Sequence, residues 1–290
     1  MQELRDLAKK LLADGTVKAV VGYAENRGSV RPIFAATPAE ADQLIFDPRC
    51  VQNLATYLSP RRAHVAALGK LAVVVKGCDA RAAAGMVREA QRRRDEFVLI
   101  GVRCGGVLAD PREKADVTEA TVASRCPGCE VREPKFVDHL VGALPPAPPG
   151  ANALDARIAE LEAMSPEERF AFWKSEFAKC VRCNACREIC PMCFCVRCLC
   201  DKSQPQWIES SPHARGNFAW HMTRALHQAG RCVACGECER ACPVGIPLNL
   251  LNRKVARVVA ERFDYVVSDD PEKPAPIGTY RLEDDQEFIR

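Results

Sequence analysis

The chain carries the same cysteine pattern twice, and this repeat constrains what it can fold into more than any other feature. Each copy reads Cys-x-x-Cys-x-x-Cys-x-x-x-Cys-Pro, ending at Pro191 in the first copy and at Pro243 in the second. Thiolates in this spacing are the ligand signature of cubane iron–sulfur clusters, and the fourth cysteine of one run ligates the cluster of the other run. We therefore predict two 4Fe-4S clusters with crossed ligands. The first cluster takes Cys180, Cys183, Cys186 and Cys242, and the second takes Cys232, Cys235, Cys238 and Cys190.

The composition indicates reduced, metal-bound thiols rather than a secreted disulfide scaffold. The chain has 17 cysteines, an odd number, and opens with an amphipathic segment instead of an apolar export signal. No apolar run approaches the roughly 20 residues that cross a bilayer. The net charge of +3, from 41 basic and 38 acidic residues, is too balanced to indicate nucleic-acid binding. We expect a cytoplasmic protein with no direct membrane span and no nucleic-acid partner.

A proline-rich segment divides the chain. Residues 142–150 hold four prolines and two glycines, which suits an extended spacer and neither a helix nor a central strand. We predict an α/β domain over 1–141, a linker over 142–153, a helical domain with the two clusters over 154–263, and an extended tail over 264–290. The tail is rich in proline and in charge, so we expect it to dock on a partner.

Apolar runs and helix-length segments alternate in the upstream part. Residues 71–75 and 97–102 are continuous apolar runs of the kind buried on both faces of a parallel sheet. The alanine-rich segment 79–94 predicts a helix that starts at Asp79 and completes a strand–helix–strand unit. The predicted fold class is therefore an α/β N-terminal domain with a mainly parallel sheet, joined to a mainly α-helical dicluster ferredoxin domain.

Helix signals dominate the downstream part. A serine at 165, a proline at 166 and a glutamate at 168 mark a helix start, because they form a capping box with proline in the first turn. Two further helices are expected over 216–228 and 247–263, where the second has an apolar stripe.

Further cysteines lie at the expected ligand edge of the sheet. Cys78 and Cys104 each follow a predicted parallel strand, and open α/β sheets bind ligands at that edge. Cys126 and Cys129 form a Cys-x-x-Cys turn in a later loop. We predict an upstream cluster on Cys104, Cys126 and Cys129, with Cys78 or Cys50 as the fourth ligand. A thiol-redox pair at the turn, or cysteines that only pack, are the alternatives.

The same edge suits a bound cofactor with a phosphate. Glycines beside the cysteines let the backbone approach a bound group, and a helix N-terminus after a strand favours a phosphate. Lys76 either neutralises that phosphate or is an ordinary surface lysine. The candidate cofactor-binding residues are Lys76, Gly77, Asp79, Gly105 and Gly106.

Four more cysteines follow the first run directly. Thiols this close together favour zinc or a further cluster, and otherwise are buried thiols that pack near a cluster. They are Cys193, Cys195, Cys198 and Cys200.

Two resemblances to known families refine these expectations. The long insertion between the two runs, and the segment 235–247, resemble the helical dicluster ferredoxin domain found in the iron–sulfur subunits of heterodisulfide reductases and succinate dehydrogenases. The strings 75–82 and 100–106 resemble the beta-subunit family of deazaflavin-reducing (coenzyme F420) hydrogenases and dehydrogenases, although Arg103 stands where that family usually has proline. The second resemblance implies a flavoprotein-like domain that binds a flavin such as FAD.

The leading hypothesis is an iron–sulfur electron-transfer subunit of a soluble redox complex, of the hydrogenase, formate dehydrogenase or heterodisulfide reductase type. Its partners would be the other subunits of that complex. One alternative is a self-sufficient flavin and iron–sulfur oxidoreductase that reduces a soluble hydride carrier such as a deazaflavin. The other is a zinc-bound interaction scaffold, which the two complete cysteine–proline runs argue against.

Overall fold

A five-stranded sheet forms the upstream half of the computed structural model, which describes residues 1–209 and 211–283. Its strand order is β2-β1-β3-β4-β5, and β1, β3, β4 and β5 run parallel while β2 pairs antiparallel with β1 at one edge. The predicted mainly parallel sheet is confirmed. The strands are β1 (Ala19–Asn26), β2 (Ser29–Ala35), β3 (Leu71–Val75), β4 (Phe97–Val102) and β5 (His139–Val141).

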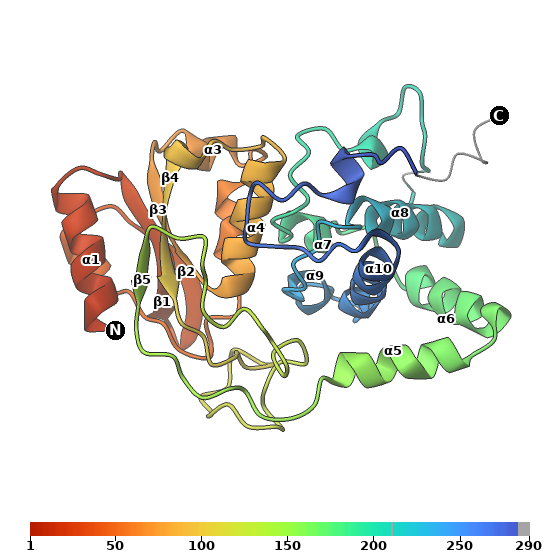
Figure 1. Ribbon diagram of the computed structural model, residues 1–290, viewed down its shortest axis with the longest axis horizontal. Coiled ribbons are helices and arrows are strands. Elements are labelled where there is room, and N and C mark those ends of the chain that lie inside the picture. Colours follow the sequence, from red (N-terminus) through yellow and green to blue (C-terminus); the bar gives the residue numbers. More distant parts are fainter. Residues whose placement is uncertain (210, 284–290) are drawn as a thin grey trace.

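Helices cover both faces of this sheet. In Figure 1, α1 (Gln2–Ala13) lies on one side, and α4 (Gly77–Arg88) lies on the other side, facing the downstream half. Strands β3 and β4 are buried at every residue, as expected for apolar runs covered on both faces. Two short helices, α2 (Pro38–Ala41) and α3 (Ala63–Ala66), complete the half with 3-10 turns at Leu54–Leu58 and Arg94–Glu96.

The helix after β3 starts earlier and ends earlier than its sequence predicts. Lys76, not Asp79, is the N-cap, and the Asp79 carboxylate sits one turn inside and accepts the Lys76 backbone N–H at 3.1 Å. A carboxylate at this third position satisfies an otherwise unpaired backbone donor, so it stabilises the start without being the cap. The helix ends at Arg88, and Ala90 beyond it has a left-handed backbone with φ of 53°.

The downstream half is helical, as predicted. The capping box between Ser165 and Glu168 is formed, with the serine side chain accepting from the Glu168 backbone at 3.2 Å. The helices expected over 216–228 and 247–263 lie within two residues of those bounds, and the third starts at Pro166, as expected. The helices are α5 (Ala153–Ala163), α6 (Pro166–Ala178), α7 (Ala185–Glu188), α8 (Ala214–His227), α9 (Glu237–Arg240) and α10 (Leu248–Phe263), with 3-10 turns at Leu199–Asp201 and Pro276–Gly278.

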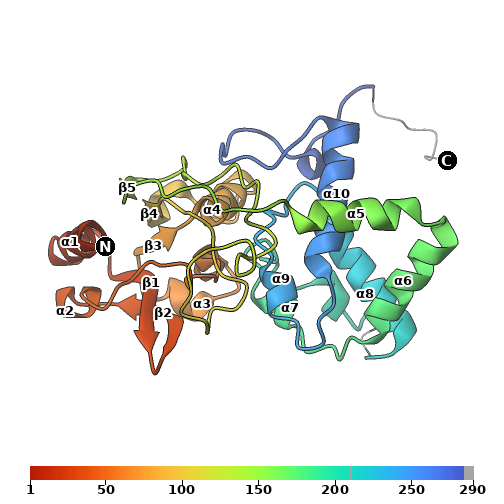
Figure 2. The same cartoon turned by 90° about the horizontal axis from the view of Figure 1, so that it is seen from below.

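Helix α4 is packed between the sheet and the cysteine-rich half, and Figures 1 and 2 show this from two directions. Met192 and Phe194, which follow the first cysteine run, belong to the same hydrophobic core as the sheet. A side chain at Gly85 of α4 would overlap Met192, so glycine permits this close contact. Arg231 also donates to Glu89 at 2.8 Å. The two halves therefore share one interface.

The linker and the tail also pack on the upstream half. Residues 142–152 contain no helix or strand, and their prolines lie against the glycines at 105 and 106. Tyr265, Val267 and Ala275 are buried in the core beside α4, and Arg88 donates to the carbonyl of Ser268 at 2.9 Å. Within the expected tail, 284–290 lie outside the described residues, and docking on a partner stays a prediction. No helix in the described part of the chain is both long and apolar enough to cross a membrane.

Candidate cysteine-rich cofactor sites

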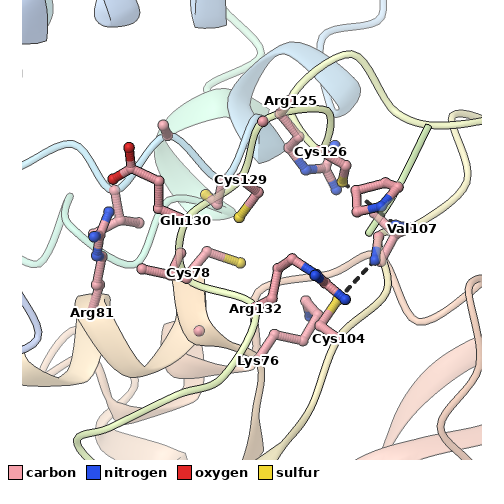
Figure 3. Close-up of a pocket in the computed structure, with 18 of the residues that line it drawn as sticks. Lys76, Cys78, Arg81, Cys104, Val107, Arg125, Cys126, Cys129, Glu130 and Arg132 are labelled. Carbon is pink, nitrogen blue, oxygen red and sulfur yellow. Dashed lines mark hydrogen bonds between the residues drawn. The ribbon is translucent and has the colours of Figure 1, made fainter. Parts of the chain in front are cut away.

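The carboxyl ends of β3 and β4 form one wall of a cavity of about 290 Å³. Cys78 follows β3, Cys104 follows β4, and the later loop brings in Cys126 and Cys129 (Figure 3). We name these four cysteines the strand-edge site. The structure thus brings together the three ligands predicted first and places Cys78 as the fourth thiol. Parallel strands deliver both of their carboxyl ends to one edge, which explains the convergence.

Cys50 does not join this cavity. Its thiol is fully buried and accepts the backbone N–H of Asp47 at 3.3 Å. Burial raises the pKa of Cys50 to about 12. Of the two alternatives for the fourth ligand, the geometry favours Cys78.

Glycines hold the loops of the strand-edge site close together. A side chain at Gly77 would overlap the carbonyl oxygen of Val131, so the loop after Cys129 packs directly on the start of α4. Gly106 has a φ of 99°, and its N–H donates to the Cys104 sulfur at 3.4 Å. The Cys104 N–H in turn donates to the carbonyl of Arg132 at 2.9 Å. These residues support the cysteines through backbone contacts.

Lys76 is buried beneath the site, so its interpretation as a surface lysine is wrong. Its ammonium group donates to the Tyr23 hydroxyl at 2.6 Å, to the Gln52 carbonyl at 2.8 Å and to the Asp79 carboxylate at 3.0 Å. An ammonium group has three hydrogens, so these partners use all its donors and leave none for a phosphate. Lys76 instead forms a buried ion pair with Asp79 beside Cys78.

Burial dominates the electrostatics of these thiols. It raises the pKa of Cys78 well above the usual range, and it raises the pKa of Cys104 to about 11, although Lys76 opposes the second shift. Thiols must lose their protons to ligate a metal, so cluster binding at this site releases protons. Arg81, Arg125 and Arg132 also line the cavity, which makes its surroundings positive and suited to an anionic group.

The two cysteine runs fold alike. In both, the residues two and four positions after the first cysteine have left-handed backbones: Arg182 and Asn184 in the first run, Ala234 and Gly236 in the second. In both, a single turn of helix follows, as α7 or α9. The sequence repeat is therefore also a repeat in backbone conformation.

The first site lies against aromatic side chains. Burial raises the pKa of Cys180, and the nearby thiols of Cys183 and Cys242 add to the shift. Cys186 is buried in the hydrophobic cluster that holds Phe177 and Trp220, with Cys180 and Cys242 at its border. The first site is hereafter Cys180, Cys183, Cys186 and Cys242.

The second site is a small cavity with cysteines from both runs. Hereafter it comprises Cys190, Cys232, Cys235 and Cys238, which all line that cavity. Cys193 lies next to Cys190, and the hydrogen bond between their thiols lowers the pKa of Cys193 to about 6. Gln228 holds this pair, because its amide donates to the Cys193 sulfur at 3.4 Å.

The four extra cysteines do not face a common point. Cys193 lies at the second site, and Cys195 is exposed. The Cys198 thiol is hydrogen-bonded to the thiol of the buried Cys200, beside the first site. In residues 1–209 and 211–283, no three His, Cys, Asp or Glu side chains are grouped as a single metal ion requires. This finding does not bear on a cubane cluster, which spreads its four thiolates around a larger body.

The three sites are neighbours. Cys235 of the second site also lines the strand-edge cavity, together with Val233 and Ala234. Arg125 lies between those two sites, and Arg224 lies between the second site and Cys186 of the first. The sequence analysis did not predict either arginine. The only signal that could have indicated one of them is that Arg125 directly precedes Cys126.

The donor chemistry at these sites fits iron–sulfur clusters. Backbone N–H groups point at several cysteine sulfurs, as from Arg182 to Cys180 and from Ile246 to Cys242, both at 3.4 Å. Such bonds stabilise thiolate ligands. The buried Arg224 has an Nε–H with no partner in the described residues, and that donor can bond a sulfur atom.

Comparison with known proteins finds relatives for about a third of the chain. No protein-family model matches it. It is 32% identical over 103 residues to the F420-dependent formate dehydrogenase subunit beta of Methanocaldococcus jannaschii. It is 22% identical over 106 residues to the F420-dependent formate dehydrogenase 1 subunit beta of Methanococcus maripaludis.

These matches cover 35% and 37% of this chain but only 26% and 27% of the relatives, so the chain spans about a quarter of their length. The predicted resemblance of the helical half to the iron–sulfur subunits of heterodisulfide reductases is untested by them and stays a prediction. The predicted resemblance to the F420-dependent dehydrogenase beta subunits is confirmed, over about a third of the chain.

Proposed function

We propose that this chain is an electron-transfer subunit of a multi-subunit oxidoreductase of the formate dehydrogenase or hydrogenase kind. The two relatives are named as formate dehydrogenase beta subunits, which supports a subunit role. The observation that carries the proposal is the shared wall between sites: Cys235 belongs to the second site and also lines the strand-edge cavity. Redox centres this close together suit electron transfer from one to the next. A catalytic site would not need three neighbouring cysteine sites.

We assign one 4Fe-4S cluster to each of the three sites from their cysteine ligands, and when bound the clusters would supply one-electron transfer. The cysteines of the strand-edge, second and first sites would hold them in that order. The chain's other residues exclude water and fix the local charge: Lys76 and Arg125 flank the strand-edge site, and aromatic rings cover the first site. Burial and nearby charge are the means by which a protein sets cluster potentials.

The strand-edge cavity favours a cluster over the flavin that the family resemblance implies. Four thiols line it, Lys76 has no free donor, and the Val131 carbonyl covers Gly77 at the helix start. Binding of FAD elsewhere stays a prediction.

Cofactor analysis of the full chain, purified without oxygen, tests the proposal. We expect about twelve irons and twelve sulfides per chain, since each cubane holds four of each. Cys78→Ser should remove about four irons, whereas the matched control Cys50→Ser should remove none. Zinc in place of iron, or equal losses in the two variants, would contradict the assignment. Flavin is measured on the same sample by its absorbance after release.

A further inference from the structure

The buried face of helix α8 carries four polar side chains beside Trp220 and Ala225, which is unusual for an amphipathic helix. Asn217, His221, Arg224 and Gln228 recur every three or four residues, and their exposed fractions are 0%, 2%, 6% and 4%. On the same helix, the side chain of Leu226 is 62% exposed. Buried polar groups lower the stability of the fold unless they have hydrogen-bond partners.

This polar stripe runs from the first site to the second. The Asn217 amide donates to the Cys180 carbonyl at 2.8 Å, and the Arg224 guanidinium donates to the Cys186 carbonyl at 3.2 Å. At the far end, Gln228 donates to the Cys193 sulfur at 3.4 Å. One helix face therefore contacts the first cysteine run and, through Arg224 and Gln228, lines the cavity of the second site.

Three members of the stripe have a buried atom without a hydrogen-bond partner in the described residues, and the first is the side-chain oxygen of Asn217, which is an acceptor. In the described residues, neither ring nitrogen of His221 has a hydrogen-bond partner, and neither has the Nε of Arg224. An unpaired buried donor costs about 1–3 kcal/mol. The His221 ring stacks on Phe177 at 4.7 Å between centroids, so packing fixes its orientation. These donors point to an acceptor that binds at the cysteines.

His221 is neutral in this setting. Burial, followed by the charges of Arg224 and Arg182, lowers the pKa of His221 to about 3. A neutral imidazole keeps one N–H donor, and a guanidinium group is always protonated. Each residue thus offers a permanent donor, and Arg224 adds a permanent positive charge.

We propose that α8 donates hydrogen bonds to cluster sulfur atoms at both sites, with His221 acting at the first site and Arg224 at the second. This inference rests on the proposed function. Hydrogen bonds to sulfur raise the reduction potential of a cluster. A positive charge does the same, because reduction adds a negative charge nearby. The two residues would contact the clusters directly and set their potentials, and they exchange no electron or proton themselves.

Redox titration of the full chain, followed by electron paramagnetic resonance, tests this inference. Arg224→Met should lower the potential of the second-site cluster by at least a tenfold change in the reduction equilibrium, about 59 mV for one electron. Arg224→Lys retains the charge and should shift it less. His221→Phe should lower the potential of the first-site cluster, since the ring shape remains and the donor is lost. The matched controls are Arg215→Met and His227→Phe, both on the exposed face of α8.

The stability of the cluster-free chain gives a second readout. Because neither His221 nitrogen is paired there, His221→Phe should leave its urea unfolding midpoint unchanged or raised. A lower midpoint would show a structural role and overturn the inference. Fully loaded variants with the same potentials as their controls would also overturn it, and would leave the proposed function standing. A wild-type chain without iron would overturn both.

Discussion

The guanidinium group of Arg125 lies 3.6 Å from the buried carboxylate of Glu237, and this ion pair joins the loop of Cys126 to the loop between Cys235 and Cys238. The pair is the physical link between the strand-edge site and the second site. A second arginine, Arg240, contacts the same carboxylate at 2.6 Å from the more exposed side.

Arg125→Met should destabilise the chain more than Arg240→Met. Removing one partner of a buried pair costs about 3–5 kcal/mol, but Arg240 remains beside Glu237, so we expect a loss of roughly 2 kcal/mol. Arg240 is less buried, and its loss should cost about 1 kcal/mol or less. Urea unfolding of both variants measures the difference, and equal losses would contradict the linking role of Arg125.

Lys76→Met should leave the Asp79 carboxylate buried without its cation, lowering the free energy of unfolding by about 3–5 kcal/mol. The double variant Lys76→Met/Asp79→Leu should recover most of this loss, because both charges are then gone. Full destabilisation in the double variant would show that the charges themselves are not the cause.

The cost of Lys76→Met should depend on pH. Burial raises the pKa of Asp79 while Lys76 lowers it, so the pKa rises further when the lysine is removed. A carboxyl group with a raised folded-state pKa loses stability as the pH rises through that value. The variant should therefore be least stable, relative to wild type, at roughly pH 8 and should recover toward roughly pH 5. If the stability difference between wild type and Lys76→Met grew toward low pH, the buried charge of Asp79 would not be its cause.

Gly77→Ala should disrupt the strand-edge site selectively. Its methyl group would overlap the Val131 carbonyl and push away the loop that carries Cys126 and Cys129, at a cost of about 1–3 kcal/mol or more. Iron analysis should show a loss of about four irons, while the first and second sites stay loaded. The control is Gly278→Ala, where nothing lies within 4 Å of the added methyl. Iron loss from Gly278→Ala, or no iron loss from Gly77→Ala, would contradict a selective effect on the strand-edge site.

Cys190→Ala should remove the cluster at the second site and spare the one at the first. The predicted crossed ligation requires this, because Cys190 lines the cavity of the second run. Cys195→Ala, at an exposed thiol, should change neither cluster. Iron content and paramagnetic resonance spectra separate the outcomes. Loss of the cluster in Cys193→Ala but not in Cys190→Ala would move the ligand to the neighbouring cysteine.

The sequence was most informative where local pattern alone determines structure. The central strands β3 and β4 match their apolar runs, because burial on both faces requires unbroken hydrophobicity. Strand β2 was missed because Pro32 and Arg31 interrupt it, which an edge strand tolerates. Strand β5 was missed because it has only three residues.

Tertiary placement explains what the sequence could not predict. Cys50 and Cys78 are both cysteines of the upstream half, and only the fold decides which one faces the cavity. The burial of Lys76 depends on Tyr23 and Gln52, which come from separate parts of the chain. The polar face of α8 has a regular spacing, but polar spacing on a helix normally indicates its solvent side.

Val266, near the end of the described chain, lines the strand-edge cavity together with Cys78 from the first third of the sequence. During synthesis, the four thiols of that site emerge before the C-terminal segment that forms part of its wall. That part of the wall is therefore absent from a growing chain that has not yet reached Val266.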